Sequence, residues 1–158
     1  MVKILPQSVL LAPDEETIKS IQDEFEIVFP EDYINFIKEN NGAIPVTNKF
    51  LYHNHEYLIE RFLCLLNEEQ ANHFAEGCYD IGVVTLELEG RLVFDEEDTG
   101  VPIIPIAALF AGDFVCFNFK NGLKKPEVCI WYHEESEEFF PEIKKIANTF
   151  TEFLNMIF

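Results

Sequence analysis

The sequence predicts an α+β fold. Helical apolar spacing occurs near the start, extended apolar runs fill the middle, and helical spacing returns at the end. A chain of 158 residues is typical of one domain, here 1–158. Hydrophobic residues make up 48% of it and include 16 phenylalanines, so material for a core is ample.

A first helix is expected over about 14–25. Pro13 and three following acidic residues suit a helix N-terminus, where carboxylates meet the positive end of the helix dipole. Ile18, Ile21 and Phe25 then follow at helical spacing.

A second helix is expected in "VFPEDYINFIKENNG". Pro30 suits a first helical position, because the N–H that it lacks has no partner there. Tyr33, Phe36 and Ile37 form an apolar stripe, and Gly42 suits the left-handed residue after the helix. These residues predict a structural role for the segment, through helix entry, packing and exit.

The middle of the chain alternates between clear and ambiguous patterns. "KFLYHNHEYLIERFLCLL" predicts two strands joined near Asn54-His55-Glu56, and "NEEQANHFAEG" a loop or short helix. Residues 81–92 fit either a hairpin turning at Glu89-Gly90 or one helical face, and periodicity leaves both open.

A second group of strands is expected after residue 100. Pro102 and Pro105 should keep the apolar stretch 101–106 from being a fully paired central strand. Strands 114–119 and 127–133 follow, separated by a turn, and form an antiparallel hairpin.

The last segment is expected to be one long helix covering the sheet. Its apolar residues recur at helical spacing: Ile143, Ile146, Ala147, Phe150, Phe153, Leu154 and Ile157.

The formal net charge of −18 excludes several partner classes. A surface this acidic repels nucleic-acid phosphates and anionic lipid. The chain has no apolar run of about 20 residues, the length that spans a bilayer, and no convincing signal peptide, so we expect a cytoplasmic protein. An acidic field steers a basic protein partner, although the charge could also serve solubility alone.

Catalytic and metal-binding motifs are missing from the sequence. His53 and His55 would share one face of a strand and could bind a metal with Glu56 or His73, but this spacing is looser than in zinc sites. We therefore expect no catalytic residue, no metal and no cofactor. The four cysteines have no CxxC spacing and are expected to be core thiols.

Two acidic segments, "FDEEDTG" and "HEESEEFFPE", are the candidate docking surfaces for a basic partner. A solvated loop is the alternative interpretation of both. Of Trp131 and Tyr132, strand alternation should point one inward, and an exposed aromatic beside the second segment would suit a binding hot spot. The candidate partner-binding residues, chosen by charge, are Glu96, Glu97, Asp98, Glu134, Glu135, Glu137 and Glu138.

Several blocks of the sequence, over about 30–158, resemble the SUKH superfamily in its branch of cell-wall-assembly-regulator-like proteins. They are "FPEDYINFIKENNG", "IPIAALFAGDFVCFNF", "KPEVCIWYHE" and "IANTFTEFLNMIF", in the family order. Phe29 replaces a usual leucine, and Ala43 stands where a second glycine is common. Pro30, Tyr33, Phe36, Gly42, Trp131 and Phe150 are the structural signature.

The resemblance implies a central, mostly antiparallel sheet flanked by helices, and it favours a helix over 81–92. It also implies a function, because bacterial members are mostly immunity proteins that neutralise a toxin, often a nuclease, by binding it. The fungal branch acts as regulatory scaffolds, which is the alternative. No catalytic residues are known for this fold.

Overall fold

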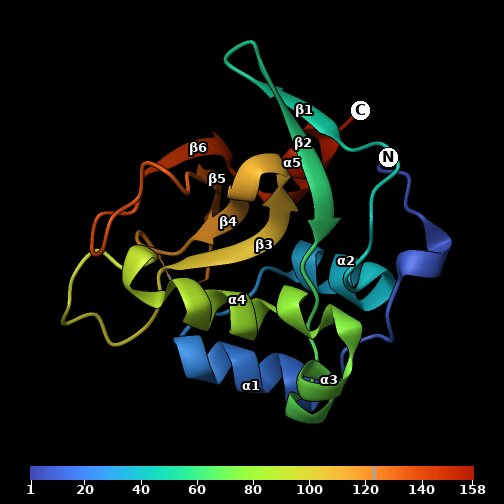
Figure 1. Cartoon of the computed structure of the whole chain (residues 1–158), viewed down its shortest axis with the longest axis horizontal. Helices are drawn as coiled ribbons and strands as arrows, with labels where there is room; N and C mark the ends of the chain where they lie inside the picture. The colour runs from blue at the N-terminus through green and yellow to red at the C-terminus, as the bar shows by residue number, and fades with distance from the viewer. Residues whose placement is uncertain (123) are drawn as a thin grey trace.

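The chain forms a curved antiparallel sheet with helices packed against it (Figure 1). The computed structural model describes residues 1–122 and 124–158. The helices and strands in this part of the chain are α1 (Glu15–Phe25), α2 (Glu31–Asn40), β1 (Lys49–Tyr52), β2 (His55–Phe62), α3 (Glu68–His73), α4 (Ile81–Leu88), β3 (Ile103–Leu109), β4 (Phe114–Asn118), β5 (Glu127–Trp131), β6 (Ile143–Ala147) and α5 (Phe150–Met156). The α+β prediction is therefore confirmed.

The strands follow one another across the sheet in the order β1-β2-β3-β4-β5-β6, and every neighbouring pair is antiparallel. The first hairpin turns at His53 and Asn54, one residue earlier than expected. Both residues have positive φ, 49° and 62°, as the tightest hairpin turns require. This hairpin projects from the body of the molecule (Figure 1).

Alternate side chains of β4 and β5 point to opposite faces of the sheet, and other elements cover both faces. Phe117 packs against the rings of Tyr33 and Phe150, which belong to α2 and α5. On the opposite face, the indole N–H of Trp131 donates to the backbone carbonyl of Arg91, just after α4. The sheet therefore has a helical cover on both sides, and the core lies along β3 to β5.

Helix α2 forms as the sequence predicts. Pro30 is its N-cap residue, one position earlier than expected, and Tyr33 and Ile37 are buried while Phe36 is partly buried. Gly42 has φ 65°, and a Cβ there would lie 2.9 Å from the Cβ of Cys64. Only glycine fits at the end of α2, because the backbone there is left-handed and a side chain would collide with Cys64.

The ambiguous segment 81–92 is a helix followed by a 3-10 turn, α4 and Glu89–Arg91. Asp80 starts α4, because its carboxylate accepts the backbone N–H of Val83. A Cβ at Gly82 would lie 3.0 Å from Cδ1 of Ile21, which shows how closely α1 crosses α4.

The prolines keep the stretch 101–106 from being fully paired, as expected, although β3 lies in the middle of the sheet. Strand β3 is buried along its whole length and pairs with both β2 and β4. Its pairing with β2 begins only at Ala107, and a bulge interrupts the β4 register between Pro105 and Ala107. Pro105 cannot donate a backbone hydrogen bond, but the ladder of hydrogen bonds is already interrupted at this position.

The expectation of one helix over Ile143–Ile157 was wrong. Residues Ile143–Ala147 form strand β6, which pairs with β5, and only Phe150–Met156 are helical. The hydroxyl of Thr149 accepts the N–H of Glu152, which starts the helix at that point. Residues 143–147 have helical apolar spacing, but they pair with β5 instead, because the backbone N–H and C=O groups along that side of β5 need hydrogen-bond partners.

The cysteines are free thiols, and Cys64, Cys116 and Cys129 are buried as expected. The expectation of a core thiol was wrong for Cys78, which is exposed. Burial raises the pKa of the Cys64 thiol to about 12. Among the described residues, no helix has both the length and the apolar character to cross a membrane.

Candidate functional site

The two acidic segments lie on the same side of the molecule (Figure 1), although about thirty residues separate them in sequence. A groove of about 470 Å³ lies between them, which we call the acidic groove. Its acidic lining residues come from α1, the end of α4 and both segments: Glu24, Glu89, Asp95, Glu96, Asp98 and Glu138. Its apolar lining includes Leu86, Val93 and Phe139.

The second segment, loop 132–142, is held by its own hydrogen bonds. The N–H of Ser136 donates to the carbonyl of Tyr132, and the Ser136 hydroxyl accepts the N–H of Glu142 at 2.9 Å. Glu137 and Phe140 exchange two backbone hydrogen bonds. A loop ordered in this way loses little conformational entropy when a partner binds.

Arg91 fixes this loop to the body of the protein. Its guanidinium donates to the carbonyls of Ser136, at 2.9 Å, and of His133. The same group lies over the Trp131 ring, 5.0 Å from the ring centroid. The charge of Arg91 is therefore directed at backbone carbonyls and an aromatic ring.

The tip of loop 132–142 presents an aromatic side chain to solvent. Phe139 has φ 62°, an uncommon conformation for a bulky residue, and its N–H donates to the carbonyl of Gly90. The next residue, Phe140, is 74% exposed, and Glu138 and Glu142 lie two residues away on either side in sequence. An exposed aromatic within a charged rim is the composition of a binding hot spot.

The first segment, loop 94–100, is tied to the end of α1. The Thr99 hydroxyl donates to the Glu26 carboxylate at 2.7 Å, and the N–H of Val101 donates to the carbonyl of Phe25. A Cβ at Gly100 would lie 2.7 Å from that carbonyl oxygen, so only glycine allows the close approach.

The acidic groove lacks a compensating ion pair within residues 1–122 and 124–158. The ion pairs of this part of the chain join Lys19 to Asp23, Lys38 to Glu15, Lys49 to Glu56 and Lys145 to Glu127. All four lie outside the groove lining. The carboxylates around the groove therefore present an uncancelled negative potential.

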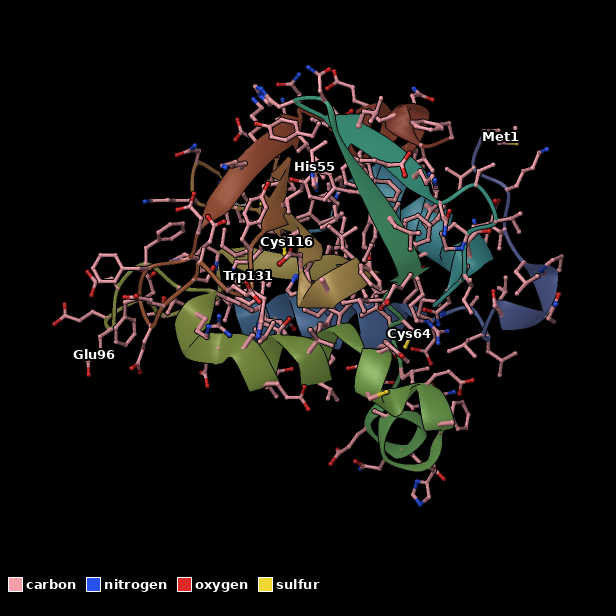
Figure 2. All side chains as sticks on the ribbon, turned by 45° about the horizontal axis from the view of Figure 1, so that its top comes forward. Met1, His55, Cys64, Glu96, Cys116 and Trp131 are labelled. Atoms are coloured by element: carbon pink, nitrogen blue, oxygen red, sulfur yellow. The ribbon has the colours of Figure 1, made fainter. Side chains whose placement is uncertain are left out.

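Three of the candidate partner-binding residues line the groove: Glu96, Asp98 and Glu138. The other four are exposed on the same loops but outside the lining: Glu97, Glu134, Glu135 and Glu137. Figure 2 shows Glu96 at the periphery, on the opposite side of the molecule from Met1 and Cys64. Glu24 and Glu89 were missed as site residues, because only the fold brings α1 and the end of α4 to the loops. Asp95 belongs to the first acidic segment but was not among the residues chosen by charge.

A protein-family model supplies the identification. The SUKH_6 model, described as SMI1-KNR4 cell-wall, matches residues 15–154. The chain belongs to the SUKH (SMI1-KNR4) family. This match confirms the resemblance given by the sequence blocks, and the sheet with its helical covers agrees with it. Among curated proteins, no sequence matches the chain.

The histidines of this SUKH chain do not share a strand face as expected. His53 lies in the hairpin turn, beside the ring of Tyr52, whereas His55 begins β2 and lies against Tyr57. Across the described residues, no group of three or more His, Cys, Asp or Glu side chains is placed to hold a metal ion.

Of the two neighbouring aromatics in the SUKH signature block, Trp131 is fully buried and Tyr132 is partly buried. The Tyr132 hydroxyl hydrogen-bonds that of Tyr57 at 2.9 Å, joining the ends of two strands that are not neighbours in the sheet. Burial, and secondly this hydrogen bond, raise the pKa of Tyr132. Tyr132 therefore supports the curvature of the sheet, and Phe140 is the more exposed aromatic of this region.

Proposed function

We propose that this SUKH protein is a non-enzymatic immunity protein, which neutralises a cognate bacterial toxin by binding a basic surface of the toxin in the cytoplasm. The observation that carries the proposal is the acidic groove, where both acidic loops converge without a compensating ion pair in the described chain. Family membership is compatible with this role, and the family resemblance implies it, because bacterial members are mostly immunity proteins.

The proposed mechanism assigns separate roles to charge and apolar contact. Uncancelled carboxylates steer a basic partner and raise the association rate. Phe140 and the apolar floor of the groove then lengthen the lifetime of the complex, since most affinity differences lie in dissociation. Glu97, Glu134, Glu135 and Glu137 extend the negative rim around this contact.

The experiment uses two charge-matched double variants. Glu96→Gln with Glu138→Gln removes two groove carboxylates for which the structure shows no hydrogen bond or ion pair among the described residues. Glu39→Gln with Glu60→Gln removes two exposed carboxylates outside the groove. The partner is the toxin C-terminal domain encoded by the neighbouring gene, titrated by calorimetry at two salt concentrations.

The groove variant should weaken toxin binding by about tenfold or more at low salt, mainly through slower association, because close interfacial charge pairs carry at least 1.5 kcal/mol or so. The control variant should stay within about twofold at physiological salt, where the Debye length is about 8 Å and exposed charges farther apart than that are largely screened. Equal losses in both variants would remove the groove from the mechanism. The absence of both a complex and protection for every adjacent toxin candidate would refute the immunity function.

The second candidate is a regulatory or scaffold protein of the cell-wall-assembly-regulator type, and the SMI1-KNR4 cell-wall description of the family favours it. Its test is affinity capture from the native cell, with the Glu96/Glu138 variant as the control bait. A reproducible endogenous partner unrelated to any toxin, lost in that variant, would support the scaffold over the immunity protein.

A further inference from the structure

A second groove lies beside the acidic groove, on the other side of the segment 98–101. It also measures about 470 Å³, and its walls are mainly apolar, so we call it the apolar groove. Its apolar lining residues are Phe25, Ile27, Phe94, Val101, Pro102 and Phe119. Glu26 and Asp98 supply carboxylates at this lining.

Lys120 lines the apolar groove and places its ammonium over the Phe94 ring, 3.9 Å from the ring centroid. Lys120 is exposed and makes no ion pair with the described carboxylates, although the chain has 29 acidic residues. A cation over an aromatic face is attracted by the quadrupole of the ring. The lining of the groove thus already places a lysine ammonium on an aromatic ring.

We propose that the apolar groove is a docking site for a lysine or arginine side chain of the protein partner, and that Lys120 occupies this site until the partner's cation displaces it. The identity of the partner rests on the proposed function. The aliphatic stem of the incoming residue packs along Ile27, Val101 and Pro102, and its charge lies over Phe94 and near Glu26 and Asp98.

The two grooves share Phe25 and the segment 98–101. Thr99 and Val101 anchor this shared segment to α1 through the contacts with Glu26 and Phe25. One basic segment can therefore cross it and place one cation in each groove. Charge complementarity selects this occupant over an apolar peptide, because carboxylates flank the segment on both sides.

The test titrates the whole protein, without any toxin, with Nα-acetyl-lysine N-methylamide and its arginine counterpart, and follows backbone amide shifts by NMR. Nα-acetyl-norleucine N-methylamide is the uncharged control probe. Lys120→Met removes the ammonium from the Phe94 ring. Lys144→Met is the matched control variant, because Lys144 also lies over an aromatic ring, that of Tyr132 at 5.1 Å, outside the groove.

Lys120→Met should bind the two cationic probes about two- to fivefold more tightly than Lys144→Met. This factor corresponds to one exposed cation–π contact, the contact between Lys120 and Phe94 with which the probe no longer competes. The shifts should centre on Phe94, Thr99 and Gly100. Adding Phe94→Leu to Lys120→Met should abolish the gain while the thermal unfolding midpoint shows that the fold persists. The norleucine probe should bind more weakly than either cation.

Equal affinities in the two lysine variants, or shifts that centre elsewhere, would overturn this assignment. If toxin binding is intact while the lysine variants bind the probes equally, the apolar groove fails and the proposed function stands. If the probes behave as expected while no basic partner binds, the proposed function fails and the cation site stands.

Discussion

Tyr33 offers a sharp test of whether the signature helix α2 has a structural role. Its ring lies 5.1 Å from the rings of Phe29, Phe117 and Phe150, centroid to centroid, and is 1% exposed. Its hydroxyl is buried without a hydrogen-bond partner among the described residues. The ring and the hydroxyl should therefore have opposite effects on stability.

Tyr33→Ala removes the ring from the centre of an aromatic cluster, and we expect it to lower the free energy of unfolding by about 3–5 kcal/mol. That is a large part of the 5–15 kcal/mol or so that is typical of natural domains. Tyr33→Phe keeps the ring and removes only an unpaired buried hydroxyl. It should raise the free energy of unfolding by about 1 kcal/mol, because the desolvation cost of that hydroxyl disappears.

The assay is urea unfolding followed by circular dichroism at pH 7, with toxin binding measured on the same samples. An unchanged free energy of unfolding in Tyr33→Ala together with lost binding would refute the structural role of the helix. A loss of more than about 1 kcal/mol in Tyr33→Phe would show that the hydroxyl is paired, which contradicts the burial argument.

Three further perturbations test other parts of the site. Gly100→Ala should lower the thermal midpoint, since its Cβ would meet the Phe25 carbonyl at 2.7 Å, and an unchanged midpoint would show that the loop can shift freely. Arg91→Met should cost about 2–3 kcal/mol and change the near-ultraviolet signal of Trp131, because charged hydrogen bonds to loop 132–142 are lost. Asp80 has a raised pKa, from burial opposed by backbone N–H donors, so its stabilising contribution is full below pH 3.8 and declines as pH rises through the folded pKa. The difference in unfolding free energy between the wild type and Asp80→Asn should therefore fall with rising pH, and a difference that grows would contradict the direction of the shift.

The local chemistry of the sequence determined the elements that depend on nearby residues. Helix α1 begins at the capping residue Asp14, and α2 follows a proline and ends before Gly42, because capping and backbone conformation act over a few residues. The family blocks were also local, and the family match confirmed the assignment that they gave.

Only the tertiary structure decided the elements whose state depends on distant partners. The bulge beside Pro105 allows β3 to occupy the sheet centre, and the edge of β5 that β4 leaves unpaired draws residues 143–147 into a strand. The segment 81–92 fits two periodicities by itself, and burial against the sheet and α1 selects the helix.

The candidate site divides in the same way. Charge density in the sequence indicated Glu96, Asp98 and Glu138, because runs of acidic residues are visible in one dimension. It gave no sign that Glu24 and Glu89 would join them, or that Lys120 would lie on Phe94. Those neighbours come from separate elements, and their proximity follows from how the helices and loops pack around one end of the sheet, a long-range property that no local pattern encodes.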